Sequence, residues 1–176
     1  MKPSLTDTLC TRCGLCCDGS LFADVELGGP AEAAGLEILG LEIEDDDADG
    51  ELLVQPCAAL RGKRCTIYEH RPECCRTFEC RLLEDVRRGA VTVERAEEHI
   101  AATLERIGRV DALIARLGRG DPRLPLKERF AEALARNAGA NPEVERRRAE
   151  LEAEMSAVER SIQNTFLGEG RAGARR

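Results

Sequence analysis

The feature that most constrains this chain is the placement of its cysteines. All nine lie in the N-terminal half, between Cys10 and Cys80. Such a local density is typical of a fold held together by disulfides or by metal. The chain has no tryptophan, one tyrosine and four phenylalanines among its 176 residues, so large core side chains are scarce. We therefore expect the cysteines to stabilise the N-terminal half.

The choice between disulfides and metal depends on the cellular compartment. The first nine residues, MKPSLTDTL, contain one lysine and no apolar stretch of signal-peptide length, and no run of eighteen apolar residues occurs anywhere. The sequence therefore predicts a cytoplasmic protein with no membrane association. Thiols stay reduced in the cytoplasm, and an odd number would leave one cysteine unpaired. Metal binding is accordingly favoured over disulfide pairing.

The charge of the chain argues against one class of partner. The net charge is −7 and the isoelectric point is about 5.1, which opposes the broad positive surface that nucleic acid requires. We expect no nucleic-acid partner. Basic residues do gather near the cysteines, as Arg12, Lys63, Arg64, Arg71, Arg76 and Arg81. They are suited to offset the charge of about −2 that four thiolates leave on a zinc ion.

Composition divides the chain into three stretches. Residues 1–90 are expected to form the metal-binding module, residues 91–167 a helical extension and residues 168–176 a disordered tail. Within the module, Leu21–Leu27 and Glu51–Gln55 are predicted strands, while Glu73–Arg88 is a predicted helix after Pro72. Between the strands we expect a weak helix from Pro30 and then an acidic loop. The predicted fold class is α+β, a small cysteine-stapled module with short strands followed by helices.

The extension shows helical periodicity. Val93–Leu117 places apolar residues three or four positions apart, which predicts a long amphipathic helix. A shorter helix is predicted for Leu126–Asn137, closed by Gly139, and a third opens with Asn141 as N-cap and Pro142 as the first helical residue. The last helix would turn Val144, Leu151, Met155, Val158 and Ile162 inward. We expect these helices to pack on the module or on one another, with a docking surface for another protein as the alternative.

The first four cysteines stand in the sequence CTRCGLCC, as Cys10, Cys13, Cys16 and Cys17. Two-residue spacers let successive thiolates turn toward one metal ion. The spacing is similar to the first three cysteines of bacterial ferredoxin motifs, without their distal Cys-Pro. Neighbouring side chains in an extended segment point to opposite sides, so Cys16 and Cys17 favour two centres over one.

The second set comprises Cys57, Cys65, Cys74, Cys75 and Cys80. We expect amides at a helix N-terminus to stabilise a thiolate at Cys75. Two tetrathiolate sites or one polynuclear cluster would account for eight ligands. All-sulfur ligation suits zinc and iron alike, and an iron-sulfur cluster is equally compatible. Because eight cysteines fill two tetrahedra, we do not expect His70 to be a ligand.

The motifs CTRCGLCC and PCAALRGKRCTIYEHRPECCRTFEC, from Pro56 to Cys80, resemble the YkgJ-type cysteine-cluster family, the CxxCxxCC zinc- or iron-chelating domain. The resemblance extends to about Leu83. Eight cysteines match the pattern and are implied as metal ligands: Cys10, Cys13, Cys16, Cys17, Cys57, Cys65, Cys75 and Cys80. Cys74 falls on a variable position and is an extra thiol. Relatives in this family include flagellin lysine methylases, where the domain is part of a larger enzyme.

These observations predict a metal-binding protein with a thiolate-ligated zinc or iron centre, iron-sulfur included, of structural role. One alternative is an enzyme component, of methyltransferase type or redox, that uses an iron-sulfur cluster. The sequence offers little for it, since it contains no glycine-rich nucleotide loop, no Ser-His-Asp set and no CxxxCxxC radical motif. The other alternative is a metal-handling or adaptor protein that docks a partner through its C-terminal helices. Tyr68 and Phe78 are expected to cover the metal site.

Overall fold

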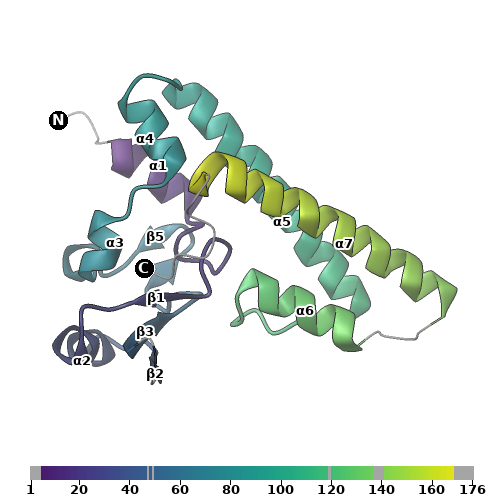
Figure 1. Cartoon of the computed structure of the whole chain (residues 1–176), viewed down its shortest axis with the longest axis horizontal. Coiled ribbons are helices and arrows are strands. Elements are labelled where there is room, and N and C mark those ends of the chain that lie inside the picture. The colour runs from purple at the N-terminus through teal and green to yellow at the C-terminus, as the bar shows by residue number, and fades with distance from the viewer. Residues whose placement is uncertain (1–4, 47, 49, 119, 137–140, 169–176) are drawn as a thin grey trace.

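The computed structural model describes residues 5–46, 48, 50–118, 120–136 and 141–168 (Figure 1). Short antiparallel strands and small helices form the cysteine-bearing part, and three longer helices follow it, which confirms the α+β prediction. The predicted helix end at Gly139 and the predicted tail from residue 169 onward lie outside the described residues.

The N-terminal part alternates short helices and strands around two small sheets. A three-stranded antiparallel sheet has the order β1-β3-β2, and Leu53 at its centre pairs with Val25 on one side and Ile43 on the other. A two-stranded hairpin pairs β4 with β5. The elements are α1 (Leu5–Cys13), β1 (Asp24–Glu26), α2 (Pro30–Ile38), β2 (Ile43–Asp46), β3 (Gly50–Val54), β4 (Leu60–Arg61), β5 (Arg64–Cys65), η1 (Tyr68–His70), α3 (Glu73–Thr77) and α4 (Arg81–Arg87).

Two local predictions for this part were wrong. The acidic segment after α2 is strand β2 instead of a loop, because Ile43 pairs with Leu53 and carries its charged neighbours onto the sheet edge, a place where charged residues are usual. The predicted helix Glu73–Arg88 is broken into α3 and α4. Phe78 is extended at the break, and its ring lies edge-on to Phe22 at 5.2 Å between centroids.

The helical extension follows the predicted periodicity closely. The helices are α5 (Val93–Leu117), α6 (Leu126–Arg136) and α7 (Pro142–Ile162), which continues into the π-helical turn η2 (Gln163–Leu167). Helices α5 and α7 lie side by side in Figure 1, and the hydroxyls of Thr103 and Ser161 meet between them at 2.7 Å. Among the described residues, no helix is long and apolar enough to cross a membrane.

The main hydrophobic core joins both ends of the chain. Leu9 of α1 and Leu82 of α4 are buried in the same cluster as Ile107 of α5 and Leu151 of α7, and Phe166 of η2 is 1% exposed there. A second, smaller cluster lies between α2 and the three-stranded sheet and includes Val25, Leu36 and Leu53. A division of the chain at residue 90 stays a prediction, because the main core spans that position.

The N-cap of α7 offers a simple test of the helical extension. The side chain of Asn141 accepts a hydrogen bond from the Val144 amide at 3.1 Å, as the sequence predicted. Asn141→Ala is expected to lower the free energy of unfolding by about 1 kcal/mol, because one helix-terminal amide loses its partner. Asn141→Ser, which can still cap, is the control for thermal or denaturant unfolding. Equal stability of the alanine and serine variants would contradict the role of this cap.

Candidate metal centre

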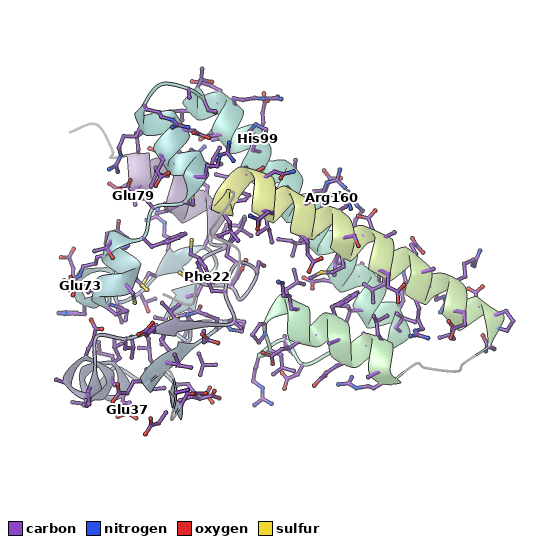
Figure 2. The ribbon with its side chains drawn as sticks, in the orientation of Figure 1. Phe22, Glu37, Glu73, Glu79, His99 and Arg160 are labelled. Carbon is purple, nitrogen blue, oxygen red and sulfur yellow. The ribbon has the colours of Figure 1, made fainter. Side chains whose placement is uncertain are left out.

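The cysteines gather around one cavity of about 600 Å³. Sulfur atoms lie in this region beside the labelled Phe22 in Figure 2. All nine cysteines, each within the described residues, are free thiols. Eight line the cavity, namely Cys10, Cys13, Cys16, Cys17, Cys57, Cys65, Cys74 and Cys75. Cys80 does not line it and sits at the N-cap of α4. The fold therefore brings together two sets of cysteines that lie far apart in the sequence.

Backbone contacts bring these two sets together. The Cys57 amide donates to the carbonyl oxygen of Cys17 at 2.8 Å and to the side-chain oxygen of Gln55 at 3.1 Å. Gln55 is 1% exposed and so is held in place by the core. In addition, a Cβ on Gly14 would lie 3.4 Å from the Lys63 side chain. The turn after α1 therefore packs directly on the β4–β5 hairpin.

The first thiol group consists of Cys10, Cys13, Cys16 and Cys80. Burial raises the pKa of Cys10 to about 11, and negative charge on Cys80 raises this pKa further. Burial likewise raises the pKa of Cys13 to about 12, with added repulsion from Cys80 and Cys10. The pKa of Cys16 is raised well above 9.0 by burial and then by the charge of Cys13 and Cys80. Each of these thiols therefore lies within range of the charge of other members of the group.

The second thiol group consists of Cys17, Cys57, Cys65 and Cys75. Burial raises the pKa of Cys17 to about 12, and charge on Cys57 and Cys65 adds to the rise. The pKa of Cys57 is raised by burial and by Cys65. Cys75 is influenced by both Cys17 and Cys57. Cys16 and Cys17, although adjacent, are thus influenced mainly by different thiols, although charge on Cys17 also raises the pKa of Cys16. Two metal centres stay a prediction.

Cys74 and Cys75 play unequal parts in this arrangement. A hydrogen bond between the two side chains raises the pKa of Cys75 and lowers that of Cys74. The nearby charge that acts on Cys74 comes from Glu32 of α2, whereas Cys75 is influenced by the second thiol group. Charge on Cys74 also raises the pKa of Cys75, and Cys74 lines the cavity, so its role as the extra thiol stays a prediction. The prediction that helix amides stabilise a thiolate at Cys75 also stays a prediction.

Backbone amides point at other sulfurs instead. The Leu15 amide bonds to the sulfur of Cys13. The amides of Ala59 and Leu60 bond to the sulfur of Cys57, and the amides of Leu82 and Leu83 bond to the sulfur of Cys80. Each of these hydrogen bonds opposes the rise in the pKa of its thiol. In all three cases the donor lies two or three residues after the cysteine. Hydrogen bonds to sulfur favour the thiolate form, which is the form that binds metal. Both groups are therefore prepared for thiolates.

Aromatic and basic side chains complete the lining. Arg71 stacks on Tyr68, with its guanidinium carbon 3.6 Å from the ring centroid, and its positive charge lowers the pKa of both Cys10 and Cys17. Arg71 thus acts on both thiol groups. Phe78 lines the cavity as predicted, together with Phe22. No sequence pattern pointed to Phe22, which lies in the segment predicted as a strand. His70 is exposed and is not among the lining residues.

The thiols surround the cavity without meeting at a point. Across the part of the chain that the structure describes, no three histidine, cysteine, aspartate or glutamate side chains form a group that could hold a metal ion as it stands. Binding would therefore have to draw the sulfurs of each group together. The donor set still fits the class of ion, because eight free thiols, three of them with amide hydrogen bonds to sulfur, suit zinc or iron.

The fold and this donor set define a cysteine-rich metal-binding module. The model of the CxxCxxCC family, under the description "Putative zinc- or iron-chelating domain", matches residues 9–97 of the chain. The match spans half of the chain, and the protein belongs to this family. It includes every cysteine of the two thiol groups and ends in the first turns of α5. No curated protein and no solved structure gives a significant match.

Proposed function

We propose that the chain holds zinc or iron in two centres, each bound by four thiolates, and that both centres are structural. The observation that carries this proposal is that the fold gathers cysteines from both parts of the motif around one cavity, where the Cys57 amide bonds to the Cys17 carbonyl oxygen. The charge effects among the thiols are consistent with two sets of four. Four thiolates complete a tetrahedron and leave no open position for a substrate. Cys74, the ninth thiol, stands outside both sets.

The positions of the ligands support a structural role. The first group joins α1 to the start of α4, and the second joins the loop after α1 to the β4–β5 hairpin and α3. The apolar cluster beside the sheet is small and includes no aromatic residue. Metal–thiolate bonds at these points would link segments that the apolar core holds weakly, as in other small metal-stapled domains.

An iron-sulfur cluster is the second candidate, because eight of the nine thiols line one shared cavity. Cysteine thiolates hold such clusters in sets of four, so the same two groups would serve. A redox or methyltransferase-type role would then follow from the cluster and not from any other residue set identified in the chain.

Docking of a partner by the C-terminal helices stays a prediction. Their apolar faces are largely buried in the main core, where α5 and α7 meet. The large apolar side chains with high exposure, among the described residues, are Ile38, Leu39 and Tyr68, and all three lie in the N-terminal part. A surface on α5 or α7 would therefore have to act through polar and charged residues.

Anaerobic purification followed by elemental analysis and a visible absorption spectrum tests the proposal. About two zinc or iron ions per chain without acid-labile sulfide would support two tetrathiolate centres. Iron with labile sulfide and visible absorption would support the iron-sulfur candidate. A chain that retains neither metal after purification and binds neither on addition would refute both.

Proton release on metal binding provides a further prediction. Zinc is expected to displace about four protons for each ion bound near neutral pH, because each ligand must lose its proton. Burial keeps those protons on the metal-free chain, with the pKa of Cys10 at about 11 and that of Cys17 at about 12. Zinc affinity should therefore fall steeply as the pH is lowered from about 8 to about 6. An indicator dye in weakly buffered solution measures the release, and about two protons per ion or fewer would contradict four-thiolate ligation.

A further inference from the structure

The loop that carries Cys16 and Cys17 contacts the first residue of helix α6. The Leu126 amide donates a hydrogen bond to the carbonyl oxygen of Gly19 at 3.0 Å. Gly19, Pro125 and Leu126 are all buried, and Leu126 is fully so. A residue of the helical extension therefore directly supports a segment that supplies one ligand to each thiol group.

The contact at Gly19 leaves no space for a side chain. A Cβ at this position would lie 2.9 Å from the Cα of Pro125 and 3.4 Å from ring atoms of Pro56. The first of these is a backbone atom that cannot move aside alone. Gly19 also has a φ of +78°, which glycine adopts readily and other residues rarely do. Pro56 precedes Cys57, so three segments converge on this glycine.

The same loop is fixed on its other side by the thiol-bearing segments. The Cys17 carbonyl oxygen accepts from the Cys57 amide at 2.8 Å. The Asp18 side chain accepts from the Ser20 amide at 2.9 Å, which tightens the turn around Gly19. Only Asp18 separates Cys17 from Gly19. A movement of Cys17 toward a metal ion is therefore transmitted to the Gly19 carbonyl.

Helix α6 is attached to its surroundings at several points among the described residues. The Arg129 guanidinium pairs with Asp111 of α5 at 2.5 Å, and Lys127 pairs with Glu159 of α7 at 3.9 Å. The Arg129 guanidinium also bonds to the carbonyl oxygen of Leu124, which precedes α6, at 3.1 Å. A further attachment is the contact of its first residue with Gly19. The position of the helix start is thus determined jointly by α5, by α7 and by the ligand loop.

We propose that the docking of α6 on Gly19 positions Cys16 and Cys17 for metal binding, and that bound metal in turn tightens the docking of α6. This inference rests on the proposed function, since it assumes that both cysteines are ligands. Two binding events that share one element influence each other equally in free energy. Gly19, Pro125 and Leu126 act here as positioning residues, because none of them carries a ligand atom.

The variant Gly19→Ala tests this coupling in the zinc-loaded full-length chain. Its added methyl group separates the loop from Pro125 without altering a thiol. We expect zinc release to a competing chelator to become about tenfold faster, within the usual range of coupling between sites. Amide hydrogen exchange in the first turns of α6 should also become about tenfold faster while zinc is still bound.

Gly40→Ala is the matched control. Gly40 has a φ of +81°, close to that of Gly19, but a Cβ there would have nothing within 4 Å. The control therefore reproduces the backbone strain without the clash, and its zinc release and α6 exchange should equal those of the wild-type chain. A second variant, Pro125→Gly, loosens the connection from the helix side and should give the same two changes as Gly19→Ala.

Two results would overturn the inference. One is that Pro125→Gly, and Gly19→Ala where it folds, release zinc and exchange the α6 amides at the same rates as the wild-type chain. The other is identical α6 exchange in the wild-type chain with and without zinc. Failure of the wild-type chain to bind zinc or iron at all would instead refute the proposed function, so the two failures are distinguishable.

Discussion

Removal of zinc from the purified chain by a strong chelator is expected to unfold the N-terminal part, residues 5–88. Structural zinc bound by thiolates contributes roughly 10 kcal/mol or more of folding free energy, whereas a whole domain has a net stability of only about 5–15 kcal/mol. The apolar cluster between α2 and the sheet is small and centres on residues such as Leu36 and Leu53. Without metal, this cluster has little to balance the conformational entropy of the loops around it.

Thermal unfolding followed by circular dichroism, with hydrogen exchange of β1 and β3, measures this effect. The same chelator already saturated with zinc is the control, because it separates metal removal from other effects of the reagent. Readdition of zinc should restore the transition. A chain that keeps its melting temperature and its protected strand amides after complete metal removal would show that the centres are not structural.

The second large effect is the number of bound metal ions that the chain loses when a single cysteine is replaced. Cys13→Ser is expected to remove the ion of the first thiol group and leave the other, while Cys57→Ser removes the ion of the second group. The reason is that each tetrahedral ion needs all four of its thiolates to be held tightly. Native mass spectrometry of the zinc-loaded chain counts the ions directly.

Cys74→Ser is the matched control for these variants. It also replaces a half-buried thiol at the cavity, but the family pattern predicts that Cys74 is not a ligand. We expect this variant to keep both ions. If either ligand variant lost all metal while Cys74→Ser kept it, the wild-type chain would hold one polynuclear cluster and not two separate centres. Loss of an ion in Cys74→Ser would make Cys74 a ligand.

Much of the fold could be predicted from local sequence. Helix α5 has the bounds that its periodicity predicts, and Asn141 caps α7 as expected. These features depend on residues close together in the chain. The wrong predictions involve residues that are distant in the chain. The segment at Ile43 is a strand because it pairs with the strand that contains Leu53. The helix after Pro72 is interrupted where the Phe78 ring contacts Phe22. Local patterns carry no information about such pairs.

The candidate site shows the same limit. The spacing of CTRCGLCC indicated that Cys16 and Cys17 serve different centres, because adjacent side chains diverge. The sequence could not divide the other cysteines between the two proposed centres. This division depends on the hydrogen bond from the Cys57 amide to the Cys17 carbonyl oxygen. It also depends on the helix break that places Cys80 at the N-cap of α4. Nor could it indicate that Gln55 holds the Cys57 amide from a buried position.

The sequence by itself therefore determined the kind of chemistry, the family and the helices, because residue type, spacing and periodicity are local properties. Only the tertiary structure decided that the two distant sets of cysteines surround one cavity, and that Leu126 of α6 contacts the ligand loop at Gly19. These arrangements follow from packing between segments that are distant in the chain. Their energies depend on burial and on close contact, which arise only when the chain has folded.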